Sequence, residues 1–290
     1  MLEIEPEVEM RKKSQIEHDV HEKTYLMESE EETIRLEVKT DPDELRRQAL
    51  WCGIKPGMRV LDVACGPGKT TSLLYEIIQP GGSIVGIDYS ESRIQYARKN
   101  YGKQGIEFIQ KDFREKMQDI GEFDLVWVRF VLEYYREEAF NIVSNLKEYV
   151  REGGTLCLLD LDYNCLSHFE LPDQLAVILP KIMNYLNDKY NFDVFAGRKL
   201  YSFLYDAGFE DIDVKITGNS VLFGNKKDSV KYDWLKKIEI ASIKAKEVID
   251  KYHGGYIQLS EDFRQYLENP KSFTYTPLIV CKGTKITTVD

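Results

Sequence analysis

A short apolar run, a turn of small residues and a helix follow one another directly between residues 59 and 78. The run Arg59–Ala64 (RVLDVA) is typical of a buried strand, and the turn after it contains Gly66 and Gly68. Glycine is needed where the backbone adopts angles that a Cβ forbids, or where a ligand lies against bare backbone. The helix start adds unpaired N–H groups and a partial positive charge. This segment therefore predicts an α/β fold with a ligand-binding turn.

The alternation of strand and helix continues as far as residue 161. We expect strands at 59–64, 83–88, 106–110, 123–128 and 155–161, and helices at 43–51, 69–78, 91–100 and 137–150. Buried strands joined to helices by short connections imply a parallel sheet covered on both faces. Beyond residue 161 the pattern is less regular, with helices expected at 172–189, 198–207 and 228–252 and strands at 209–216 and 274–282.

Charge and composition exclude several classes of protein. The chain of 290 residues carries a net charge of −10, which argues against a nucleic-acid partner and against binding to an anionic membrane surface. Its five cysteines form no CxxC motif, and no apolar run approaches the roughly 20 residues that span a bilayer. The charged N-terminus lacks the apolar core of a signal peptide. We expect a cytoplasmic protein without a structural metal.

Three classes of cofactor use a glycine-rich turn of this kind, and neighbouring residues discriminate among them. A dinucleotide fingerprint registered on the two glycines requires a small residue where this chain has Thr71. A phosphate-binding P-loop ending in Lys69 and Thr70 would place its first glycine at Val63, inside the strand. Asp88 lies 20 residues beyond Gly68, where nucleotide-binding α/β folds place a carboxylate for the ribose hydroxyls.

The remaining pattern is an acidic residue followed by three small ones at alternate positions: Asp62, Ala64, Gly66 and Gly68. It resembles the first motif of class I S-adenosylmethionine-dependent methyltransferases, although family members usually have glycine at position 64. The resemblance continues in order through residues 86–90, 110–113, 123–133 and 146–156, so that it covers about residues 50–162. The stretch Tyr25–Leu36 also resembles the helical lid of a small-molecule subgroup of this family.

The resemblance implies a Rossmann-like, doubly wound α/β fold. We expect a mostly parallel seven-stranded sheet with an antiparallel edge strand, plus helical cap insertions. The expected division is an N-terminal helical lid (1–44), a cofactor-binding core (45–162), a helical insertion (163–196), a continuation of the core (197–218), a helical cap insertion (219–270) and a final core strand (271–290).

The resemblance also implies roles for individual residues towards S-adenosyl-L-methionine, the expected cofactor. Asp62 and the backbone near Ala64 and Gly66 would hold the methionine amino group, and Gly68 would let the cofactor approach the helix. The remaining cofactor contacts are expected at Asp88 (ribose), at Tyr89, Lys111, Asp112 and Phe113 (adenine), and at Arg129 and Phe130 (methionine part).

The expected function is methyl transfer to an oxygen, nitrogen or carbon atom of a small-molecule acceptor. A protein methyltransferase and a non-catalytic cofactor-binding protein remain alternatives, and Thr71 disfavours a nucleotide-dependent oxidoreductase. Candidates for an acceptor-site or proton-accepting residue are Tyr25, Glu133 and Tyr134, followed by His18, His21 and His168. No specific base is assigned, and His168 and His253 are expected to have no catalytic role. Aromatic residues beyond position 160 either line an acceptor pocket or form core. The sequence does not fix the acceptor or the oligomeric state.

Overall fold

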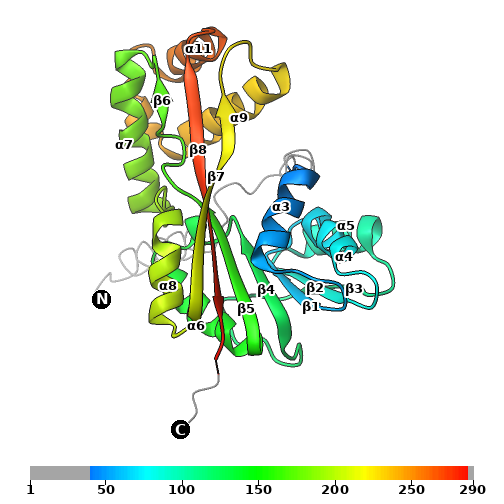
Figure 1. The fold of residues 1–290 in the computed structure, drawn as a ribbon. Helices are drawn as coiled ribbons and strands as arrows, with labels where there is room; N and C mark the ends of the chain where they lie inside the picture. Colours follow the sequence, from blue (N-terminus) through cyan, green and yellow to red (C-terminus); the bar gives the residue numbers. More distant parts are fainter. Residues whose placement is uncertain (1–39, 287–290) are drawn as a thin grey trace, which may run out of the picture.

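The computed structural model describes residues 40–286, which form one eight-stranded sheet covered by helices (Figure 1). The strand order is β3-β2-β1-β4-β5-β8-β6, with β7 also paired to β8. The strands are β1 Arg59–Val63, β2 Ser83–Asp88, β3 Ile106–Gln110, β4 Phe123–Arg129, β5 Val150–Leu161, β6 His168–Phe169, β7 Glu210–Leu222 and β8 Phe273–Thr284.

The first five strands run parallel, and β8 is antiparallel to β5, β6 and β7. This arrangement confirms the Rossmann-like, mostly parallel sheet with antiparallel strands towards one edge. Two details were not predicted. β8 lies between β5 and β7, and β6 adds an eighth strand of only two residues, too short to produce an alternating pattern in the sequence.

Helices cover both faces of the sheet because successive strand residues point to opposite sides. In β1, Val60 packs with α3 and α4, whereas Leu61 packs with α6 and α8 on the other face. The helices are α3 Pro42–Cys52, α4 Lys69–Ile77, α5 Glu91–Tyr101, α6 Ala139–Leu146, α7 Asp173–Tyr190, α8 Leu200–Asp206, α9 Asp228–Lys244, α10 Lys246–Ile249 and α11 Gly255–Glu268. Within residues 40–286 no helix is long and apolar enough to cross a membrane.

A second apolar core lies at the end of β8 where the strand begins, among α7, α9, α10 and α11 (Figure 1). We call these helices the cap. The helix predicted over 228–252 is interrupted at Ala245, because the bend brings Ile249 and Tyr252 into the core of the cap. No helix was predicted at α11, which begins after Gly254 and contributes Phe263 and Tyr266 to the same core.

Candidate functional site

The turn between β1 and α4 is held in left-handed backbone conformations. Ala64, Gly66 and Gly68 have φ values of 54°, 57° and 94°. A Cβ on Gly68 would lie 2.8 Å from the Cβ of Ala97 and 2.9 Å from the ring of Phe108, so only glycine fits there. Ala64 accepts a conformation that costs a non-glycine residue about 1–2 kcal/mol, which explains why glycine is usual at this position.

Asp88, at the end of β2, fixes the turn from the neighbouring strand. Its Oδ2 accepts a hydrogen bond from the backbone N–H of Gly66 at 2.9 Å, and its Oδ1 accepts one from the N–H of Ser90 at 2.9 Å. Arg93 forms an ion pair with Oδ1 at 3.3 Å. A carboxylate has about four lone-pair sites, so these bonds leave capacity for further donors.

Two groups of opposite charge, Asp62 and Arg129, interact electrostatically at the carboxyl ends of β1 and β4. Asp62 is 2% exposed, and its Oδ2 accepts a hydrogen bond of 2.6 Å from the hydroxyl of Thr71. Burial raises the pKa of Asp62 to about 7, against the opposing effects of Thr71 and Arg129. Burial likewise lowers the pKa of Arg129 to about 10, so its guanidinium is charged at neutral pH. Its Nε is buried without a hydrogen-bond partner in the part of the chain that the structure describes.

The residues expected near adenine are arranged unequally. Tyr89 is 55% exposed, whereas Phe113 is buried in the core and meets Tyr135 edge-on at 5.5 Å. The guanidinium of Arg114 donates two hydrogen bonds to the carboxylate of Asp112, from Nε to Oδ1 at 2.8 Å and from Nη2 to Oδ2 at 2.5 Å. This pairing raises the pKa of Arg114 above its ordinary value. Arg114 was not predicted, because nothing in its local pattern signals the pair.

A pair of buried carboxylates follows β4 and ends β5. Glu133 is 2% exposed, its backbone N–H donates to Oδ2 of Asp160 at 3.1 Å, and its Oε2 accepts a 2.8 Å bond from the side-chain amide of Asn164. Burial and the neighbouring Glu133 raise the pKa of Asp160 well above its ordinary value. The two side chains therefore interact electrostatically at the end of the sheet where β4 and β5 finish.

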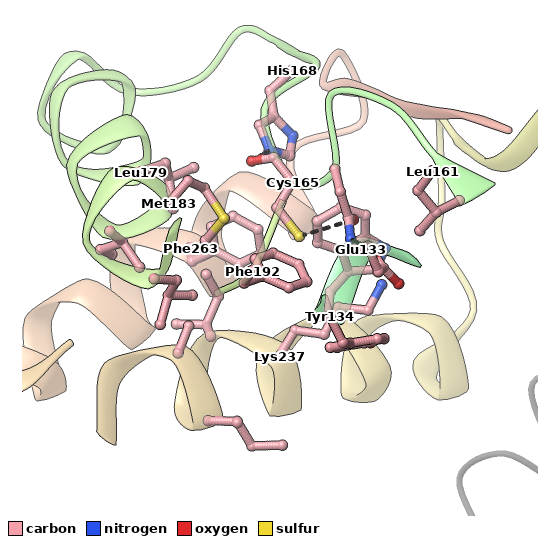
Figure 2. A pocket seen from close by; sticks show the side chains of 17 residues that line it. Glu133, Tyr134, Leu161, Cys165, His168, Leu179, Met183, Phe192, Lys237 and Phe263 are labelled. Atoms are coloured by element: carbon pink, nitrogen blue, oxygen red, sulfur yellow. Dashed lines mark hydrogen bonds between the residues drawn. The ribbon is translucent and has the colours of Figure 1, made fainter. Parts of the chain in front are cut away.

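Glu133 and Tyr134 form part of the wall of an apolar pocket between the sheet and the cap (Figure 2). The pocket encloses about 800 Å³ of space, including its open mouth. Its other lining residues come mainly from α7, α9, α11 and the loop after β5: Leu161, Asn164, Cys165, His168, Leu179, Ile182, Met183, Leu186, Phe192, Trp234, Lys237, Ile238, Ile240, Ala241 and Phe263.

Turn and pocket share the carboxyl edge of the sheet. The turn follows β1 and contacts the end of β2, while the pocket lies past the ends of β4 and β5. β1 pairs with β4, Val63 standing opposite Val128. In open α/β sheets, ligands bind in the crevice outside the carboxyl ends of the strands.

Of the other predicted site residues that the structure describes, only His168 lines the pocket. Tyr25, His18 and His21 lie outside the described residues. His253 is exposed. His168 lines the pocket, but its Nδ1 is bonded to Thr274 and its Nε2 to the carbonyl of Cys165, and burial lowers its pKa to about 4. Across residues 40–286 there is no group of three His, Cys, Asp or Glu side chains arranged to hold a metal ion.

The fold and the turn are those of an α/β protein with a glycine-rich turn at the carboxyl edge of its sheet, where ligands of such folds bind. A sequence profile described as the methyltransferase domain matches residues 54–208, which is more than half of the chain. The chain therefore belongs to the methyltransferase domain family, which confirms the resemblance found in the sequence.

Individual relatives are more distant. A demethylmenaquinone methyltransferase from Lactococcus lactis subsp. lactis is 26% identical over 110 residues, a match that covers 37% of this chain and less than half, 43%, of the relative. A solved structure of a Bacillus halodurans C-125 protein has a TM-score of 0.56 at 19% identity, covering 84% of this chain and 100% of that one. Haemonchus contortus phosphoethanolamine N-methyltransferase 2, solved with S-adenosylhomocysteine, has a TM-score of 0.53 at 15% identity, covering 84% and 53%. These two structures support the fold.

Proposed function

We propose that this protein is an S-adenosylmethionine-dependent methyltransferase that methylates a small molecule bound in the apolar pocket. The observation that carries the proposal is the electrostatic interaction between the buried carboxyl of Asp62 and the partly buried guanidinium of Arg129, at the carboxyl ends of β1 and β4 beside the turn. An amino-acid zwitterion attached to a nucleoside is the ligand that matches such a pair.

The residues of the turn suit each part of this cofactor. In the proposal, the ionised carboxylate of Asp62 holds the ammonium group, and Arg129 holds the carboxylate, which would give its buried Nε a partner. Asp88 would accept a ribose hydroxyl at Oδ2, which the bond from Gly66 leaves with a free lone pair, while Ser90 and Arg93 engage Oδ1. Adenine would lie along Tyr89, Lys111, Asp112 and Phe113, and the methionine chain along Ala64, Gly68 and Phe130.

When bound, S-adenosylmethionine supplies an activated methyl group for direct in-line displacement. The residues of the chain then have three tasks. The cap, for which we propose residues 163–196 and 219–270, would exclude water from the pocket. Tyr134 and Phe192, whose ring centroids lie 5.5 Å apart, would orient the acceptor. Glu133, which lines the pocket, would accept a proton from the acceptor.

Two features support a small-molecule acceptor inside a cell. The pocket is built over by three helices of the cap, an enclosure that suits a compact ligand better than a protein chain. None of the five cysteines, all of which the structure describes, forms a disulfide, and four of them are buried, in keeping with a cytoplasmic location.

Calorimetry with S-adenosylhomocysteine tests the cofactor assignment. We expect binding to the wild type and at least tenfold weaker binding to Asp88→Asn, equivalent to about 1.4 kcal/mol. Asp124→Asn is the matched control, because Asp124 also accepts a backbone N–H bond, from Arg59, but at the opposite edge of the sheet. Absence of binding to the wild type would refute the proposal, and unchanged affinity in Asp88→Asn would refute the ribose assignment.

Labelled methyl transfer then separates the remaining alternatives. Label entering a metabolite extract supports the small-molecule reaction, whereas label entering a protein extract favours a protein methyltransferase. Cofactor binding without transfer into either extract favours a non-catalytic binding protein.

A further inference from the structure

We infer that two copies of this chain associate by pairing their β7 strands, antiparallel to one another, about a two-fold axis that passes through Val214. The inference is independent of the proposed function, because β4, β5 and β8 separate β7 from β1 and its turn. It is carried by the exposure of β7 and by the order of the charges along it.

β7 is a long strand at the edge of the sheet. Within residues 40–286 it pairs with β8 alone (Figure 1). It has 13 residues, whereas natural proteins usually keep edge strands short or cover them. Its register with β8 shifts between Glu210 and Asp213 and again between Gly218 and Ser220, so the regular part of the strand is 213–218. This part presents its outer row of backbone groups to the side away from β8.

Both faces of this regular part are open to solvent. Successive side chains of a strand point to opposite faces, and the four at positions 213–216 are all exposed. Among them Val214 is 42% exposed and Ile216 is 69% exposed. An exposed strand edge flanked by apolar side chains is a template for pairing with another strand.

The sequence of this segment is complementary to itself when two copies run antiparallel. If Val214 lies opposite Val214 of the second copy, Asp213 lies opposite Lys215 of the second copy, and Lys215 opposite its Asp213. Ile216 then lies opposite Ile212. Opposite charges that face each other across two strands stabilise the pair, and like charges destabilise it.

The neighbouring registers lack this complementarity. Moving the axis to Asp213 places two aspartates opposite each other, and moving it to Lys215 places two lysines opposite each other. Both arrangements bring like charges together at the centre of the pair. The order of charges therefore selects the axis through Val214 and identifies a second copy of the chain as the partner.

The backbone N–H of Val214 is already engaged by a local acceptor. It donates a hydrogen bond of 2.9 Å to Oδ1 of Asp213, the residue immediately before it. Local bonds of this kind, from backbone to a neighbouring side chain, compete with the ladder of a sheet. In the dimer the N–H of Val214 donates to the carbonyl of Val214 in the second copy, and the carboxylate of Asp213 pairs with Lys215 across the axis.

Analytical ultracentrifugation of the full chain tests the inference. We expect a reversible equilibrium between monomer and dimer in the wild type. Lys215→Asp and Asp213→Lys should each weaken the dimer about tenfold or more, because each substitution places like charges opposite one another at both symmetry-related positions. Lys99→Asp is the matched control and should not change the dissociation constant, because Lys99 is exposed on α5, which packs on β2 and β3 at the opposite edge of the sheet.

Combining the two charge changes tests the register itself. A one-to-one mixture of the Lys215→Asp and Asp213→Lys proteins should form a mixed dimer, because opposite charges then meet again at both positions. The double variant Asp213→Lys/Lys215→Asp should also recover association, since its charges are exchanged and still complementary. A thermal melt of each variant checks that it is folded.

Three results would overturn the inference. The first is a wild type that stays monomeric at every concentration measured. The second is a dimer that neither single charge reversal weakens relative to Lys99→Asp. The third is a mixture of the two folded single variants that does not associate although the wild type does.

Discussion

The partial ionisation of Asp62 predicts how affinity for S-adenosylhomocysteine varies with pH. Burial raises the pKa of this carboxyl to about 7. The ligand's ammonium group requires the ionised form, so the observed dissociation constant equals the intrinsic constant divided by the ionised fraction. That fraction is roughly one eleventh at pH 6 and ten elevenths at pH 8. We therefore predict about tenfold weaker binding at pH 6 than at pH 8, or about 1.4 kcal/mol.

Calorimetry in buffers of different ionisation enthalpy measures both the affinity and the protons released. At pH 7 about half a proton should leave per ligand bound. Asp62→Asn should bind more weakly, with little change between pH 6 and pH 8. Thr71→Val should move the transition to higher pH, because the Thr71 hydroxyl stabilises the ionised carboxylate. Asp124→Asn should retain the wild-type profile. A flat wild-type profile, or the same slope in Asp62→Asn, would refute the reasoning.

Three further changes test other parts of the structure. Gly68→Ala should lower the free energy of unfolding in urea by about 2–3 kcal/mol, because it combines left-handed backbone strain with a clash against Ala97. The control Gly57→Ala, at φ 84° with open space around it, should lower it by only about 1 kcal/mol. Equal losses in the two variants would exclude the clash. Arg129→Met should weaken S-adenosylhomocysteine at least tenfold at pH 8 by calorimetry, with Arg129→Lys losing less, and full affinity in Arg129→Met would contradict the zwitterion assignment. Burial lowers the pKa of His168 to about 4, so its contribution to stability is fully present above pH 6.5 and is lost as the pH falls through 4. The difference in unfolding free energy between wild type and His168→Phe should therefore fall by about 3 kcal/mol from pH 7 to pH 4. A constant difference would argue against burial of a neutral imidazole.

The sheet was predictable because its strands and helices alternate with strong local signals. The apolar runs at Arg59–Val63 and Ser83–Asp88 lie between turns, and each is followed by a helix with a clear start. The cap was harder to predict. Its interrupted helix at Ala245 and the two-residue β6 are set by packing between segments far apart in the sequence, which no local pattern records.

In the candidate site, too, residues with a local sequence signal were predicted and those positioned by distant packing were not. Asp62 and Asp88 were identified because each follows a recognisable strand and precedes a recognisable turn. Arg93 and Arg114 were missed as partners of Asp88 and Asp112, because an arginine on a helix or loop is usually solvent-exposed. The sequence did not decide whether aromatic residues beyond position 160, such as Trp234, line a pocket or form core, because both places bury them.

The pairing of Leu222 with Thr274 has a consequence for how such a protein diversifies. The chain leaves the sheet after β7 and returns at β8 at adjacent positions, so the segment between them can change in length without moving the ends of the two strands. A graft of different length or sequence there would replace α9, α10 and α11 without altering the register of the ladder. A change in this segment would therefore alter the pocket proposed for the acceptor while the turn between β1 and α4 stays the same.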